Sequence, residues 1–110
     1  MQQNNSWENL CSKLSEDFGV ETNLNGVLFL IGVRERGYLL RPFTKEEKID
    51  LINLGCCKLF SYNNLCQYKG DDEQGWPVWI KQPALDSFSE EEKVSILKEA
   101  AFNYFNEIDM

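Results

Sequence analysis

The sequence predicts a mainly α-helical fold, at the margin of α+β, in which four helices surround one core and a β-hairpin precedes the last helix. Two stretches offset by 45 residues begin with the same helix-capping pattern, and two more stretches place apolar residues at helical spacing before a glycine. In residues 65–81, apolar and polar residues alternate on both sides of a polar turn. A chain of 110 residues is long enough for one domain with its own core. We therefore expect residues 1–110 to form a single domain with a hairpin insert at about 65–81.

The first predicted helix spans residues 6–18. Ser6 is a suitable N-cap, and Gly19 fits the left-handed position just beyond the end. One face carries apolar side chains at helical spacing, namely Trp7, Leu10, Cys11, Leu14 and Phe18. This stripe favours a helix that packs on the core over one that presents its aromatic end to a membrane or a partner.

The second predicted helix spans residues 23–36. Asn23 or Asn25 can cap its start, Gly37 follows as a stop, and residues 27–33 are apolar almost all round, which is typical of a helix buried in the middle of a domain. A strand of the same residues that turns at 34–37 into 38–40 is the alternative, because periodicity does not separate the two. The length and both end signals favour the helix.

The third and fourth helices begin within the segments PFTKEEKIDLINLGCCKLF and SFSEEEKVSILKEAAFNYF, which align without a gap. Thr44 and Ser89 are N-cap residues with Glu47 and Glu92 three residues later, so both starts match a capping box. Apolar residues follow at a 3-4-3 spacing, which predicts an amphipathic stripe on each helix. Two independent good helix starts explain the match better than an internal duplication does.

Residues 65–70 and 76–80 are the predicted strands of the hairpin, and DDEQG at 71–75 is its turn. Pro77 has no backbone N–H, so its strand should lie at an edge or have that nitrogen facing outward. A calcium loop requires glycine at the sixth position, where counting from Asp71 gives Trp76. The acidic residues therefore indicate a solvated turn and no metal site.

Alternation along the strands predicts which hairpin residues face the core. It places Trp76, Val78 and Ile80 on one face, and we expect Cys66 and Tyr68 to be their cross-strand neighbours. All five are expected to be core residues.

Three aromatic residues are candidates for an interface with another protein. Trp79 falls on the polar face of the predicted hairpin, where it is either a contact residue or covered by another helix. Phe102 and Phe105 lie off the main apolar stripe of the last helix, which consists of Val94, Leu97, Ala101, Tyr104 and Ile108. We expect them to be able to face a partner helix.

Composition excludes several functions. The net charge is −7 with 11 Lys and Arg residues, whereas nucleic-acid binding draws most of its affinity from basic side chains. There is no histidine, so a Ser-His-Asp triad and a His-ligated zinc are impossible within this chain. No run approaches the roughly 18 apolar residues of a membrane helix, and MQQNNSWENL lacks the features of a signal peptide. We expect a cytoplasmic protein that binds neither nucleic acid nor membrane.

The four cysteines are Cys11, Cys56, Cys57 and Cys66. No pair has the C-x-x-C spacing of redox sites or zinc knuckles, and adjacent cysteines suit a disulfide poorly. We expect free, buried thiols that behave as small apolar side chains, with no metal and no cofactor.

One basic cluster, RERGYLLRPFTK, is a candidate ligand site. It would bind a small phosphate or carboxylate through Arg34, Arg36, Tyr38, Arg41 and Lys45. The alternative is structural: positive charge in the last turn of a helix complements its dipole, and the arginines can pair with the acidic residues of the C-terminal quarter.

The stretches LCSKLSEDFG, NGVLFLIGVRERG, FTKEEKIDL and YKGDDEQGWPVW together resemble a family of short, uncharacterised bacterial proteins over nearly the full chain. The elements that carry the resemblance are LFLIGVRE, the EK helix start and the hairpin pattern DE-x-GWP-x-W. The family has no assigned activity. The resemblance therefore implies a stand-alone small protein and transfers no functional residue.

The absence of catalytic equipment, together with three tryptophans, four tyrosines and seven phenylalanines, favours a non-catalytic protein-interaction or assembly protein. We expect it to self-associate, with a homodimer as the expected form. The alternatives are a protein that binds a small anion through the basic cluster and an enzyme that relies on cysteine or carboxylates.

Overall fold

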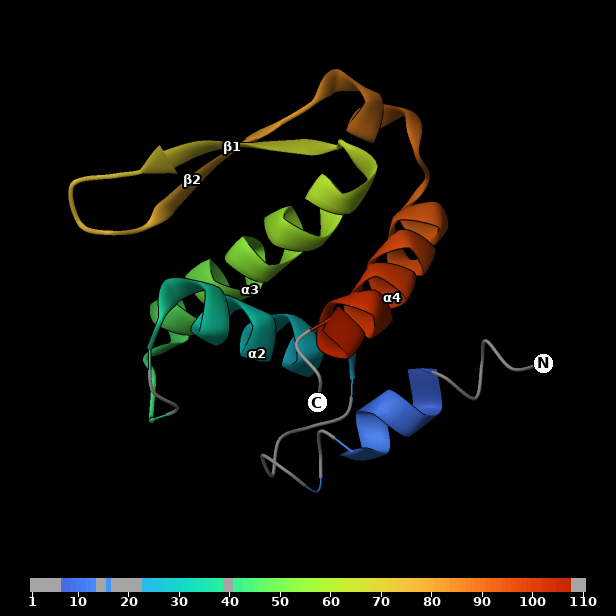
Figure 1. The fold of residues 1–110 in the computed structure, drawn as a ribbon, viewed down its shortest axis with the longest axis horizontal. Helices are drawn as coiled ribbons and strands as arrows, with labels where there is room; N and C mark the ends of the chain where they lie inside the picture. Colours follow the sequence, from blue (N-terminus) through green and yellow to red (C-terminus); the bar gives the residue numbers. More distant parts are fainter. Residues whose placement is uncertain (1–6, 14–15, 17–22, 39–40, 108–110) are drawn as a thin grey trace.

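The structure, a computed structural model, describes residues 7–13, 16, 23–38 and 41–107 (Figure 1). Residues 7–13 are helical, and the named elements follow in the order α2 (Leu24–Arg36), α3 (Lys45–Phe60), β1 (Cys66–Asp71), β2 (Pro77–Lys81) and α4 (Glu90–Glu107). Two short 3-10 turns, Ser61–Asn63 and Pro83–Ser87, flank the hairpin. The predicted fold class is confirmed, since the chain is mainly helical with an antiparallel hairpin before the last helix.

The helix expected at residues 23–36 is confirmed, and the strand alternative is wrong. Asn23 is the N-cap, because its Oδ1 accepts a hydrogen bond of 2.8 Å from the Gly26 N–H. Gly37 ends the helix with φ = 81°, and its N–H donates to the carbonyl of Val33. None of the helices in the described ranges combines enough length with enough hydropathy to form a membrane span.

Both predicted capping boxes are present. At the start of α3 the Thr44 N–H donates to Glu47 Oε1 over 2.8 Å, and the Glu47 N–H donates to Thr44 Oγ1 over 3.1 Å. Ser89 and Glu92 repeat the same two bonds, with the same lengths, at the start of α4. The backbone hydrogen bond from Thr44 is the main reason that the pKa of Glu47 is lowered. Each box satisfies two backbone donors that a helix start would leave unpaired.

The crossing of α2 and α3 brings the two backbones into direct contact. Gly32 of α2 lies so near Leu51 of α3 that an added Cβ would overlap the Leu51 carbonyl group. Gly55 of α3 lies in the same relation to the carbonyl of Leu28 on α2. The two contacts run in opposite directions along the helices, so α2 and α3 form a close antiparallel pair with glycine at both points of contact.

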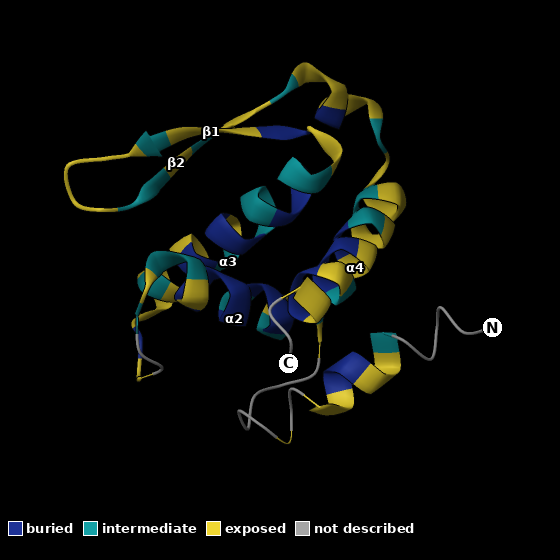
Figure 2. Cartoon of the chain, viewed as in Figure 1, coloured by how far each residue is buried: buried dark blue, intermediate teal, exposed yellow. Residues whose placement is uncertain are grey.

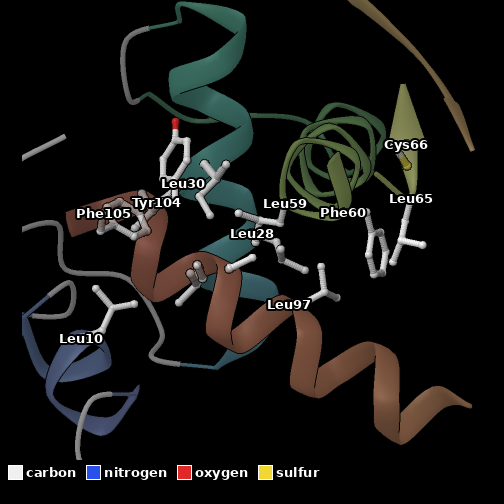
Figure 3. Close-up of a cluster of buried hydrophobic side chains, with 14 of the residues drawn as sticks. Leu10, Leu28, Leu30, Leu59, Phe60, Leu65, Cys66, Leu97, Tyr104 and Phe105 are labelled. Carbon is white, nitrogen blue, oxygen red and sulfur yellow. The ribbon is translucent and has the colours of Figure 1, made fainter. Parts of the chain in front are cut away.

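The main core lies where α2, α3 and α4 meet. Figure 3 shows buried side chains from all three helices and from the hairpin's first strand, among them Leu28, Leu30, Leu59, Phe60, Cys66, Leu97, Tyr104 and Phe105. A smaller cluster of Val33, Phe43 and Leu51, with Phe29, Tyr38 and Trp76 packed on it, lies at the other end of the α2–α3 pair. Figure 2 shows that the centre of α2 is buried, whereas most of the hairpin is exposed or half-buried.

The N-terminal helical segment covers one side of the core. Leu10 and Cys11 are each 7% exposed, and the Lys98 ammonium of α4 lies 5.5 Å from the centre of the Trp7 ring. Other residues of the predicted N-terminal helix and its ends lie outside the described residues, namely Ser6, Leu14, Phe18 and Gly19.

The prediction that Phe105 lies off the buried stripe of α4 is wrong. Phe105 is 5% exposed and belongs to the main core, and its ring meets the Tyr104 ring edge-on at 5.2 Å. Phe102 is half-buried and packs against the same cluster, whereas Val94 on the predicted stripe is 37% exposed. Because Leu10 and Cys11 also pack into this core, the buried face of α4 is broader than one stripe.

The predicted faces of the hairpin are also wrong. Tyr68 pairs with Trp79 and Cys66 pairs with Lys81, so Cys66 and Tyr68 share a face with Trp79 rather than with Val78 and Ile80. The latter face is solvated, because Val78 is 39% exposed and Ile80 48% exposed. Alternation alone does not determine register, and a slip of one residue moves every side chain to the other face.

Replacing either contact glycine with alanine is expected to lower the free energy of unfolding by about 1–2 kcal/mol, because overpacking of a core costs about 1–3 kcal/mol and outweighs the gain in helix propensity of about 1. Equilibrium urea unfolding of the Gly32→Ala and Gly55→Ala variants measures this. Asn103→Ala, at an exposed position of α4, is the control and should lose no stability. Equal stability of all three variants would contradict the close backbone contact.

Candidate functional site

A trough of about 410 Å³ lies between α3 and the hairpin. The hairpin runs alongside α3, as Figure 1 shows, with its turn toward the start of the helix. The α3 side of the trough consists of Asp50, Asn53, Leu54 and Cys57, and the hairpin side consists of Asp72, Gln74, Trp76, Pro77 and Trp79. Concave sites of this size commonly hold small ligands.

The two walls of the trough follow from local structure. Asp50, Leu54 and Cys57 lie four and seven residues apart on α3, so they share one helix face. On the other wall the Asp72 carboxylate shapes the turn, because its Oδ1 accepts bonds of 2.9 Å from the N–H groups of Gln74 and Trp76. This turn directs Trp76 toward the helices.

The polar groups of the trough have unmet hydrogen-bonding capacity. Within the described part of the chain, no hydrogen bond or ion pair engages the side chains of Asp50 and Asn53. The indole Nε1 of Trp79 is buried without an acceptor among the described residues. The lining contains two carboxylates and no lysine or arginine, and the Arg36 guanidinium lies against Trp76 and Gln74 of the hairpin wall.

Arg36 fastens the hairpin turn to the end of α2. Its guanidinium carbon lies 4.5 Å from the centre of the Tyr38 ring and 5.0 Å from that of Trp76. Its Nη2 donates to the Gln74 carbonyl over 2.9 Å, whereas its Nε is buried without a partner in the described ranges. Arg36 therefore joins the hairpin turn to the end of α2 through one hydrogen bond and two ring contacts.

The predicted anion site is only partly assembled. Arg41 reaches the other residues of this region, with its guanidinium carbon 5.3 Å from the centre of the Tyr38 ring and 4.2 Å from that of Phe43, and its Nη2 lies 3.4 Å from Glu47 Oε2. The structure thus groups Arg36, Tyr38 and Arg41. Lys45 is exposed at the first position of α3.

Arg34 belongs to a different contact, which joins α2 to α4. Its Nη1 donates to the Tyr104 hydroxyl over 3.2 Å, and that hydroxyl donates to Glu35 Oε2 over 2.7 Å. Burial, and then the bond to Glu35, raise the pKa of Tyr104. The predicted pairing of these arginines with acidic residues of the C-terminal quarter is not found among the described residues. Arg34 instead bonds Tyr104 and forms its ion pair with Glu35, at 3.8 Å.

Among the predicted interface residues, the structure places Trp79 on the α3 side of the hairpin, where it packs against the core. The trough residues Asp50, Asn53 and Trp76 were not predicted as site residues. The spacing of Asp50 and Asn53 on α3 indicated a polar face of that helix. Only the position of the hairpin shows that this face lines a trough.

The cysteines are unpaired, and burial raises the pKa of each thiol. Burial raises the pKa of Cys56 to about 11 and that of Cys66 to about 12, and it also raises the pKa values of Cys11 and Cys57. Across the ranges that the structure describes, no group of three or more Cys, Asp or Glu side chains is arranged to hold a metal ion.

Comparisons with known proteins add no relative. No protein-family model matches the chain, and neither the curated proteins nor the solved structures contain a match. The resemblance to a family of short bacterial proteins stays a prediction, and the function is argued from the geometry.

The Arg36→Lys variant is expected to loosen the hairpin turn, because an ammonium keeps the charge but loses the planar stack on two rings. Amide hydrogen exchange at residues 74–76 should accelerate by about 5- to 10-fold, which corresponds to the loss of about 1 kcal/mol of cation–π contact. Arg34→Lys, which alters an arginine on the α4 side, should leave exchange at 74–76 unchanged. Equal acceleration in both variants would contradict a local role for Arg36.

All four thiols are expected to react slowly with a disulfide reagent at pH 7.5, because a raised pKa leaves little thiolate. At pH 8 a thiol with a pKa of about 11 is ionised in about one molecule in a thousand, so labelling of the folded chain should accelerate toward pH 11. The urea-unfolded chain serves as the control for ordinary reactivity. A thiol that reacts equally fast in the folded and unfolded chains at pH 7.5 would contradict the burial effect.

Proposed function

We propose that this chain is a non-catalytic protein-interaction protein that associates with a second copy of itself through the outer face of the hairpin. The outer face consists of Gln67, Lys69, Val78 and Ile80. The observation that carries the proposal is the exposure of Val78 and Ile80, at 39% and 48%, on the face that α3 does not cover. A cytoplasmic location, expected from the sequence, belongs to the same proposal.

The hairpin has the properties of an incomplete sheet. It contains two strands, and no third strand pairs with either edge within the described part of the chain. A two-stranded sheet is marginally stable by itself and gains from packing on a further apolar surface. On one side that surface is α3, and on the other side the β-branched side chains Val78 and Ile80 meet solvent.

The charges of the hairpin fit a second copy in one orientation. The hairpin turn carries Asp71, Asp72 and Glu73, all exposed, whereas the exposed Lys81 pairs with Cys66 and therefore lies on the face toward α3. A two-fold axis that stacks two outer faces with their strands antiparallel keeps the two acidic turns at opposite ends of the contact. Val78 and Ile80 of the two copies then meet without repulsion between the turns.

The alternative of small-anion binding has less support. Arg34 is engaged by Tyr104, and Arg36 is engaged by two rings and the Gln74 carbonyl. Of the basic residues proposed for that site, Arg34, Arg41 and Lys45 are exposed, but Arg34 lies on the α4 side and Arg41 contacts Glu47. Cations in separate contacts favour a structural role.

Sedimentation velocity at several protein concentrations tests the proposed self-association. It is performed at 0.15 M salt, where the Debye length of about 8 Å limits repulsion between two chains of net charge −7. The wild-type mass should rise with concentration, whereas Ile80→Glu should remain monomeric, because it places a charge in the apolar contact.

Ile49→Glu is the matched control for this experiment. Ile49 is also 48% exposed but lies on α3 rather than on the outer face of the hairpin. This variant should associate as the wild type does. A wild type that is monomeric at every concentration, or equal dissociation in both variants, would refute self-association through the hairpin.

A further inference from the structure

We infer that the trough between α3 and the hairpin binds a small organic cation, with Asp50 as its charge partner and Trp79 as its aromatic wall. The trough lies on the side of the hairpin that faces α3, whereas self-association is proposed for the opposite face. The inference therefore does not rest on the proposed function.

The first argument is the charge of the lining. Asp50 and Asp72 contribute carboxylates, and no lysine or arginine lies among the lining residues. The Asp72 carboxylate accepts two backbone N–H bonds within the turn, so it is partly satisfied. Asp50 is exposed and has no hydrogen bond or ion pair among the described residues, which leaves its full charge for a ligand.

The second argument is the pair of indole rings. Trp is the aromatic side chain that attracts a cation most strongly, and ring faces beside carboxylates are a common arrangement for ammonium groups. The guanidinium carbon of Arg36 already lies 5.0 Å from the centre of the Trp76 ring, so Trp79 is the indole left for a ligand cation. Trp79 contacts Tyr68 at 5.4 Å between ring centres, packs against the main core and borders the trough.

The third argument is the unpaired indole N–H. Trp79 Nε1 is buried without an acceptor in the described part of the chain, and an ammonium cannot accept a hydrogen bond from it. A cation that also carries a hydroxyl oxygen supplies both groups, since its nitrogen faces Asp50 and its oxygen accepts from the indole. The N–H is covered by protein atoms, so the indole has to shift for this contact, and that shift is a measurable signature.

The volume sets the size of the ligand. A space of about 410 Å³ is at the lower end of the range for small-molecule sites. It suits an amino alcohol, or the end of one lysine side chain from a partner, rather than a folded segment. The shared chemistry of these two sources is an ammonium group, and the experiment separates them.

Two-dimensional NMR of the indole N–H groups tests the inference, because the three tryptophans yield three separate signals. The probes are choline, ethanolamine, lysine blocked at both backbone ends, glucose and inorganic phosphate. Choline and ethanolamine should shift the Trp79 signal in a saturable way, while the Trp7 signal stays unchanged. Glucose and phosphate should have no effect.

The blocked lysine identifies the source of the ammonium group. Binding of the blocked lysine more tightly than of the amino alcohols would support the ammonium site with a partner side chain as its natural occupant. Tighter binding of the amino alcohols would support a free small molecule. Glucose binding as well as choline, or no saturable shift with any cation, would overturn the inference.

Two isosteric variants locate the charge. Asp50→Asn should weaken choline binding about two- to five-fold, the upper part of the range for losing one exposed ion pair. Asp86→Asn removes the same charge from the exposed 3-10 turn that follows the hairpin, outside the trough, and should leave binding unchanged. The dispersion of the backbone amide signals verifies that each variant is folded. Equal weakening in both variants would refute a specific site.

Repeating the titration on Ile80→Glu separates this inference from self-association. The trough should bind choline equally well in that variant. Choline binding by the wild type but not by Ile80→Glu would refute an independent site in the trough. Equal binding by the two proteins would support it.

Discussion

The contact between the backbones of α2 and α3 is the constraint on which the rest of the structure depends. The two helices approach so closely because glycine lies at both contacts, Gly32 against Leu51 and Gly55 against Leu28. A Cβ atom at either glycine would overlap a carbonyl group of the other helix. This proximity buries the apolar face of α2 and brings its end, with Arg36, beside the region where the hairpin turn must lie. Both clusters of apolar side chains are built around this pair of helices.

Within the described chain, the buried hydrogen-bond donors that lack an acceptor lie at the hairpin. The two buried polar atoms without a partner among the described residues, Arg36 Nε and Trp79 Nε1, both lie where the hairpin meets the helices. A buried donor without an acceptor costs about 1–3 kcal/mol. This cost offsets part of the stabilisation that the hairpin gains from its apolar contacts. Elements held by such a balance open more readily than a core helix and suit a role in binding.

The same hairpin separates two kinds of surface. Its face toward α3 lines an open trough with indole rings and carboxylates, and its other face presents Val78 and Ile80 to solvent. The trough favours a small charged ligand, because a small site needs only a few placed polar groups. The open face favours another protein, because exposed β-branched residues gain most from a broad apolar partner. A two-stranded element with different chemistry on its faces can serve both purposes.

Local sequence encodes most of the helix starts and ends, because capping depends on residues three positions apart, although at α2 it left both Asn23 and Asn25 as candidate caps. Asn23, Thr44 and Ser89 accept the bonds that their sequence context predicts, and Gly37 takes the left-handed position. It also determined that a hairpin follows α3. Which face of that hairpin is covered depends on contacts between distant segments, since register depends on the bulge between Tyr68 and Asp71 and on the partner surface. Likewise, Arg34 and Arg36 take part in different contacts, and Asp50 and Trp79 line the same trough. Both arrangements arise from contacts between distant segments, which no local spacing encodes.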